Sequence, residues 1–163
     1  MSEFALRSRT VLLACALLLG CTIPRPGQVR AGMTAPEVVA LMGPATARYT
    51  MPGGATRLEF ATGPSGRVTW MVDLDAGGLV TQAEQVLDVR HFLLITDGMD
   101  REIVLRVLGQ PSFVRGESMQ RETWYWRYDN HDCLIGAATL SPQGRVVGGV
   151  GQMNDPACDR RTS

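Results

Sequence analysis

The residues of this 163-residue chain that could do chemistry are chiefly its four cysteines and two histidines. His131 precedes Cys133 by two positions, and residues two apart on a β-strand share a face. An imidazole beside a thiol could activate a nucleophile. Such a nucleophile also needs an orienting group and a pocket, and the sequence shows neither. The favoured interpretation is therefore a disulfide between Cys133 and Cys158.

The N-terminal segment contains the other two cysteines, Cys15 and Cys21. Arg7 and Arg9 precede an apolar run, Val11 to Leu19, that is too short for a stable transmembrane helix. The sequence Leu-Leu-Gly-Cys, ending at Cys21, follows and resembles the cleavage site of bacterial lipoproteins. The resemblance implies a signal peptide over residues 1–20 and lipid attachment at Cys21. A plain secretory signal with a chance cysteine is the alternative.

Cleavage and acylation would decide the fate of the remaining chain. Cys133 and Cys158 would be left in an oxidising compartment, with one possible pairing. Thr22 is not the aspartate that retains many lipoproteins at the inner membrane, so we expect anchoring in the outer membrane, facing the periplasm. Residues 21–30, with Pro24 and Pro26, predict an extended tether. The near-zero net charge gives no sign of nucleic acid binding.

Catalytic and cofactor motifs are missing from the sequence. Ser65 lies in Gly-Pro-Ser-Gly rather than in a nucleophile elbow, and no phosphate-binding glycine loop is present. Two histidines cannot form a histidine-rich metal site. The aspartates that could act as catalytic carboxylates are predicted to flank turns instead: Asp73, Asp75, Asp129 and Asp132. We expect no enzymatic activity, no cofactor and no metal.

A segment that occurs twice organises the chain. Gly32–Pro44 returns, after a constant shift in numbering, as Gly98–Gln110. Each copy predicts a short amphipathic helix, with Thr34 or Asp100 as its N-cap and a glycine at its end. In the first copy, Glu37 is placed to bind the Thr34 amide as in a capping box. Each helix therefore needs a sheet on which to bury its apolar stripe.

Three segments with strand character follow each helix. We expect an α+β fold of two tandem repeats, each of short helices packed on a three-stranded antiparallel meander, over residues 31–90 and 91–163. The predicted strands are Arg57–Phe60, Arg67–Leu74 and Leu79–Leu87, then Glu122–Tyr128, Cys133–Leu140 and Arg145–Gln152. The apolar density of His91–Ile95, which links the repeats, predicts that this segment is buried.

Several short motifs follow the lipoprotein signal in a fixed order: Gly32-Met33-Thr34, Gly43-Pro44, Gly98-Met99, Gly109 with Pro111, Trp124-Tyr125-Trp126 and Gly144-Arg145-Val146-Val147. Together they resemble the small protein A family of BamE-like outer-membrane lipoproteins. The resemblance implies a pair of helices on a three-stranded sheet and a partner in the machinery that inserts β-barrel proteins. The tandem arrangement is also similar to β-lactamase inhibitory protein.

The aromatic strand offers the one candidate binding site. Trp124, Trp126 and Tyr128 share one face, and packing under the helix is their favoured role. Tyr125 and Arg127 share the other face, where they are predicted to contact a partner. We therefore expect a lipid-anchored protein-binding or scaffolding module that serves outer-membrane protein assembly or envelope maintenance. The alternative is a proteinaceous inhibitor of a periplasmic or secreted enzyme.

Overall fold

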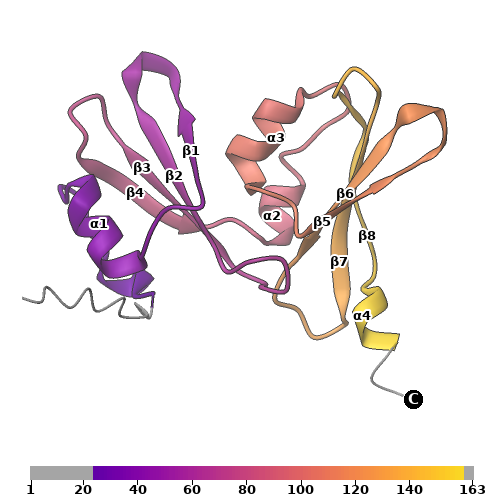
Figure 1. Ribbon diagram of the computed structural model, residues 1–163, viewed down its shortest axis with the longest axis horizontal. Coiled ribbons are helices and arrows are strands. Elements are labelled where there is room, and N and C mark those ends of the chain that lie inside the picture. The colour runs from indigo at the N-terminus through magenta and orange to yellow at the C-terminus, as the bar shows by residue number, and fades with distance from the viewer. Residues whose placement is uncertain (1–23, 160–163) are drawn as a thin grey trace, which may run out of the picture.

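The computed structural model describes residues 24–159, which form two halves with the same order of elements (Figure 1). The first half contains η1 (Pro26–Gln28), α1 (Ala35–Met42), β1 (Ala47–Thr50), η2 (Pro52–Gly54), β2 (Thr56–Ala61), β3 (Thr69–Leu74) and β4 (Val80–Gln85). The second contains α2 (Val89–Phe92), α3 (Arg101–Leu108), β5 (Phe113–Gly116), η3 (Ser118–Gln120), β6 (Glu122–Arg127), β7 (Leu134–Leu140), β8 (Val146–Asn154) and α4 (Pro156–Asp159).

The predicted fold class is wrong. Each half contains a four-stranded antiparallel sheet, in the order β1-β2-β3-β4 and β5-β6-β7-β8, and the helices are short. The architecture is mostly β rather than helices on three-stranded meanders. The prediction missed β1 and β5, which have four residues each and no apolar alternation. Backbone pairing with the neighbouring strand specifies them, as between Ala47 and Glu59.

The constant shift between the two sequence copies is repeated in the elements themselves. The displacement that carries Gly32 to Gly98 also carries α1 onto α3 at both ends, β1 onto β5 and β2 onto β6. Because the shift holds without insertion through helix and strands, each residue of this part of the first half has a counterpart in the second. This correspondence allows one half to be compared with the other, position by position.

Helix α1 has the ends that its sequence predicts. The Glu37 carboxylate accepts hydrogen bonds from the Thr34 backbone N–H at 2.7 Å and from the Thr34 hydroxyl at 2.8 Å. At the other end, Gly43 follows the last turn at φ +83°. The apolar stripe of α1 lies on one face of the first sheet. The core there contains Val38 and Met42 from α1 and Leu58, Phe60, Val72, Leu74 and Val80 from the strands.

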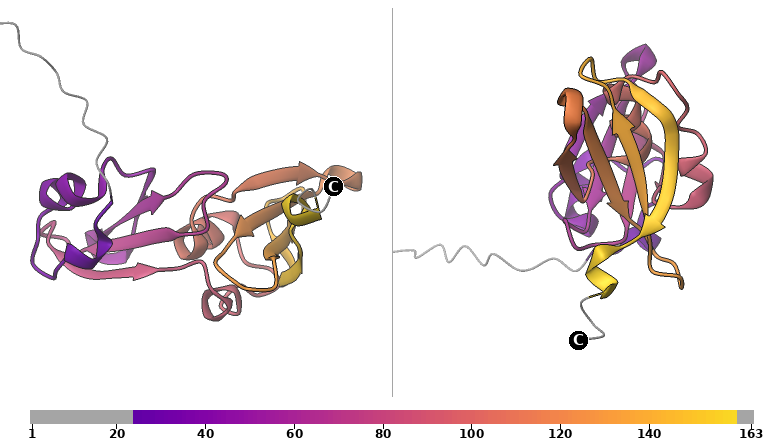
Figure 2. Two further views of the ribbon diagram at one scale, coloured as in Figure 1. Left: turned by 90° about the horizontal axis from the view of Figure 1, so that it is seen from below. Right: turned by 90° about the vertical axis from the view of Figure 1, so that its right-hand side faces the viewer.

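Helix α3 lies between the two sheets (Figure 1). Val104 and Leu108 are fully buried in a core with Trp124 and Trp126 of the second sheet. That core also includes residues of the first half, namely Met71, Val86 and Leu87. The left view in Figure 2 is elongated and shows the two halves at opposite ends of the molecule. Helix α3 therefore serves both halves.

The segment that links the halves is only partly buried, which corrects the prediction for His91–Ile95. Phe92 and Ile95 are each 3% exposed, whereas Leu93 is 75% and Leu94 is 56% exposed. A short helix has an inner and an outer side, so consecutive apolar residues cannot all reach the core.

The described part of the predicted tether, residues 24–30, contacts the first half. The Arg25 N–H donates to the Leu41 carbonyl at 3.0 Å, and Val29 is buried in the first core. None of the helices within residues 24–159 is long and apolar enough to cross a membrane.

Candidate functional site at the junction of the two halves

A buried carboxylate joins the halves. Glu59 is 0% exposed and lies on the face of β2 that is turned away from α1. Its two carboxylate oxygens accept the backbone N–H of Gln110, just beyond α3, at 3.1 and 3.2 Å. The Tyr49 hydroxyl also donates to this carboxylate. Burial raises the pKa of Tyr49, and the bond to Glu59 adds to that increase, so the phenol remains protonated as a donor.

Gly109 makes room for this carboxylate. It ends α3 at φ +77°, and a Cβ at this position would lie 2.9 Å from the Glu59 carboxyl carbon. Any other residue would therefore be strained in its backbone and would push against a buried charge. The same glycine carbonyl accepts the indole N–H of Trp126 at 3.1 Å. The C-terminal end of α3 thus contacts both sheets, through Glu59 of the first and Trp126 of the second.

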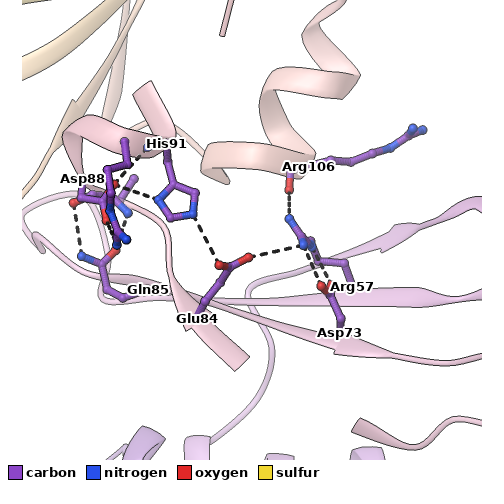
Figure 3. A network of polar contacts seen from close by, with 9 residues as sticks. Arg57, Asp73, Glu84, Gln85, Asp88, His91 and Arg106 are labelled. Carbon is purple, nitrogen blue, oxygen red and sulfur yellow. Dashed lines mark hydrogen bonds and ion pairs between the residues drawn. The ribbon is translucent and has the colours of Figure 1, made fainter. Parts of the chain in front are cut away.

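A second polar network lies nearby, centred on Arg57 (Figure 3). The Arg57 guanidinium donates to both Asp73 carboxylate oxygens, at 2.6 and 2.7 Å, and to the Arg106 carbonyl oxygen at 2.8 Å. That carbonyl belongs to the last turn of α3. Cations are favoured there because the last carbonyl groups of a helix lack helical hydrogen-bond partners and form the negative end of its dipole. Arg57 is 14% exposed, so its contacts are shielded from water. Asp73, predicted to flank a turn, lies near the end of β3, where it pairs with Arg57.

The network continues to α2 through Glu84 and His91. Glu84 lies 3.7 Å from Arg57 and 3.5 Å from His91 Nε2. On the other side of the ring, Asp88 caps α2 by accepting the His91 backbone N–H at 3.0 Å and contacts His91 Nδ1 at 2.9 Å. Burial tends to raise the pKa of Asp88, but the bonds from His91 and Arg90 outweigh it and lower that pKa to about 2.

The Asp88 cap predicts a specific dependence of stability on pH. Because the folded-state pKa lies below the ordinary value of 3.8, the cap stabilises the protein above pH 4 and loses that contribution as the pH falls toward 2. The carboxylate is 30% exposed, so screening reduces the effect to about 1 kcal/mol. Urea unfolding of wild type and Asp88→Asn should show a wild-type advantage at pH 6 that disappears at pH 2. A difference that stays constant with pH would contradict this assignment.

Both networks connect the two halves. The polar atoms of Glu59 and Arg57 are occupied by partners from the protein itself. Residues 24–159 contain no group of three or more histidine, cysteine or acidic side chains placed to hold a metal ion. The junction thus joins the two sheets into one frame.

The predicted binding residues Tyr125 and Arg127 do share a face of β6, but internal contacts cover most of both. Tyr125 is 6% exposed and stacks on Phe113 with ring centroids 4.5 Å apart. Arg127 donates to Asp155 at 2.8 Å and to the Pro64 carbonyl at 2.8 Å. Their role in partner binding stays a prediction. On the opposite face, Trp124, Trp126 and Tyr128 lie in the core beneath α3.

The other predicted residues fall outside any common site. The sulfur atoms of Cys133 and Cys158 lie within bonding distance, with their Cα atoms 6.5 Å apart, and this pair ties the loop before β7 to α4. Asp75 accepts the backbone N–H groups of Gly77 and Leu79 in a turn. Asp129 and Asp132 lie in the loop between β6 and β7. Cys21 lies outside the described residues.

Comparisons with known proteins do not place the chain in a family. No protein-family model matches it, and neither do the curated proteins or the solved structures searched. The resemblance to BamE-like lipoproteins therefore stays a prediction. Any functional assignment depends on the surface of this chain itself.

An apolar surface feature of the described residues was not predicted from the sequence. Val89, Leu93 and Leu94, here called the α2 patch, are 46%, 75% and 56% exposed on one short segment. Arg90 beside them has a side chain that is 86% exposed. The shortness of the segment could have predicted this exposure, because a single helical turn buries only one of its sides. Clustered exposed apolar residues of this kind are typical of a contact surface.

Proposed function

We propose that this protein is a lipid-anchored periplasmic binding or scaffolding module of the outer membrane, without catalytic activity. Its anchor is the acylated Cys21, and its partner is another protein of the cell envelope. The α2 patch is the surface that binds this partner. Assembly of outer-membrane proteins is the process in which we place it, on the strength of the motifs shared with BamE-like lipoproteins.

The observation that carries this proposal is the exposure of Leu93 and Leu94. Their neighbours Phe92 and Ile95 are buried and attach the segment to the core on both sides of the exposed leucines. A partner that covers them would remove apolar area from water at little cost in conformational entropy. The exposed Arg90 would add a polar contact at the edge, a residue type common at binding hot spots.

The frame supports a binding role as well. Contacts through Glu59 and Arg57 join the halves. Glu84 of the first sheet lies 3.5 Å from His91 of α2, so α2 is also attached to this junction. A preorganised surface binds with less ordering cost than a flexible one. Binding through Tyr125 and Arg127 is less favoured, because Phe113, Asp155 and Pro64 already contact those side chains.

Site-specific photo-crosslinking in cells tests the proposal. A photoreactive phenylalanine analogue placed at Leu93 should crosslink to one envelope protein. The matched control is Met119, an apolar residue of η3 that is 73% exposed. The same analogue at Met119 should give no such product. Equal crosslinking at both positions, or none at Leu93, would overturn the assignment of the α2 patch.

The anchor is tested separately in the same strains. Mass spectrometry of the purified wild-type protein should show acylation at Cys21, and Cys21→Ala should move the protein from the membrane to the soluble periplasmic fraction. A crosslink to a soluble enzyme that is unaffected by Cys21→Ala would favour an inhibitor instead.

A further inference from the structure

An apolar pocket lies in the first half, beside the start of the described chain. It is a cavity of about 340 Å³ between η1, the end of α1 and the sheet. Its walls consist of Pro24, Pro26, Met42, Pro44, Phe60, Ala61, Thr62, Val68 and Trp70. None of these residues is charged. The hydroxyl of Thr62, the one polar side chain, already bonds the Val68 backbone at 2.8 Å. The lining therefore favours an apolar ligand.

The second half shows what fills the corresponding place there. Phe92 of α2 is 3% exposed and packs edge-on against Tyr128, with ring centroids 5.1 Å apart. Gly136 leaves space for it, because a Cβ there would lie 2.8 Å from the ring. The shift between the halves places Pro26 at the position of Phe92. The proline ring is too small to fill the space that the phenylalanine side chain fills in the second half. Trp70, the counterpart of Gly136, replaces part of the lost volume and still lines an open pocket.

The position of the chain indicates the occupant. Pro24 forms part of the wall, and Cys21 is three residues earlier. Three residues span at most about 10 Å, so a group attached to Cys21 is within reach of the pocket. The lipoprotein signal predicts that this group is an acyl chain. A chain tethered so closely has an effective concentration on the order of millimolar.

We propose that this pocket binds an acyl chain carried by Cys21, in the place that Phe92 occupies in the second half. The inference rests on the proposed lipid anchor. With one chain held by the protein, the first half would be fixed against the membrane instead of hanging from a free tether. The ligand class is a saturated alkyl chain, recognised by shape and apolar surface rather than by a head group.

The first test uses the mature chain, residues 21–163, with Cys21→Ser and a free probe, 12-bromododecanoic acid. Bromine quenches nearby tryptophan, so the probe should quench Trp70 saturably. Affinity should rise about fourfold with each added methylene, from 8-bromooctanoic acid upward, until the cavity is full. Trp70→Phe should remove the saturable quenching, since Trp124 and Trp126 are buried in the other core. Val68→Phe, which narrows the pocket, should weaken binding at least tenfold without changing the unfolding midpoint.

The second test asks whether the attached chain is the occupant. This test uses residues 21–163 with Cys21 retained; because Cys133 is joined to Cys158, Cys21 is the remaining cysteine of that chain. Labelling it with N-dodecylmaleimide should weaken binding of the free acid at least tenfold, whereas N-ethylmaleimide should have no effect. Absence of probe binding to the Cys21→Ser chain would refute the pocket as an acyl site. Binding that dodecyl labelling leaves unchanged would refute Cys21 as the source and indicate a lipid from elsewhere. Neither result depends on acylation in cells, which mass spectrometry measures independently.

Discussion

Replacing Glu59 with alanine should destabilise the protein by about 3–4 kcal/mol. The carboxylate is 0% exposed and accepts hydrogen bonds from the Gln110 backbone and the Tyr49 hydroxyl. Bonds to a charged acceptor contribute about 1.5–3 kcal/mol each, and their loss leaves two partly buried donors without this partner. Because Glu59 belongs to the first half and Gln110 to the second, the variant also loosens the junction. Urea unfolding followed by tryptophan fluorescence measures the change.

Two matched variants separate the causes. Glu59→Gln retains an oxygen for the Gln110 N–H, and its amide can donate to the Tyr49 oxygen, so it should cost only about 1 kcal/mol. Tyr49→Phe removes the hydroxyl donor and its hydrogen bond to Glu59, and should cost a similar amount. If Glu59→Ala were no more destabilising than Glu59→Gln, the junction would not depend on this carboxylate.

Removing the cysteine pair should cost about 3 kcal/mol. The bond closes a loop between residues 25 positions apart, and its main effect is to reduce the entropy of the unfolded chain. For a protein of this size that corresponds to a fall in Tm of about 6–12 °C. Thermal unfolding of Cys133→Ser/Cys158→Ser under oxidising conditions measures this effect.

Reduction provides the control for that variant. Dithiothreitol should lower the Tm of the wild-type protein to that of the double serine variant, and it should leave the variant itself unchanged. A wild-type Tm that is insensitive to reductant would show that the two cysteines are not joined in solution. A fall in Tm of the variant on reduction would point to another effect of the reagent.

The junction explains why two similar halves have different roles. Helix α1 covers one sheet, whereas α3 contacts both, because Gly109 and the Gln110 N–H fit around Glu59. The corresponding residues in the first copy are Gly43 and Pro44, and proline has no N–H to donate. The counterpart of Glu59 in the second sheet is Tyr125, which has no carboxylate. The polar contact thus exists once, between the halves.

The amino-acid sequence by itself determined the features that depend on neighbouring residues. The constant shift between the two copies, the cap formed by Thr34 and Glu37 and the glycine ends of α1 and α3 could all be predicted from it. So could the burial of Trp124 and Trp126 on one face of a strand. These signals lie within a few residues of where they act, because capping and strand alternation are local.

Only the tertiary structure decided the rest. The four-residue strands β1 and β5 exist because β2 and β6 offer them partners. Nothing local to Glu59 predicts the distant Gln110 N–H as its partner. Likewise, the exposure of Leu93 and the covering of Tyr125 depend on which surfaces the rest of the chain leaves free. Such choices follow from long-range packing, and a residue's own neighbours in sequence do not encode them.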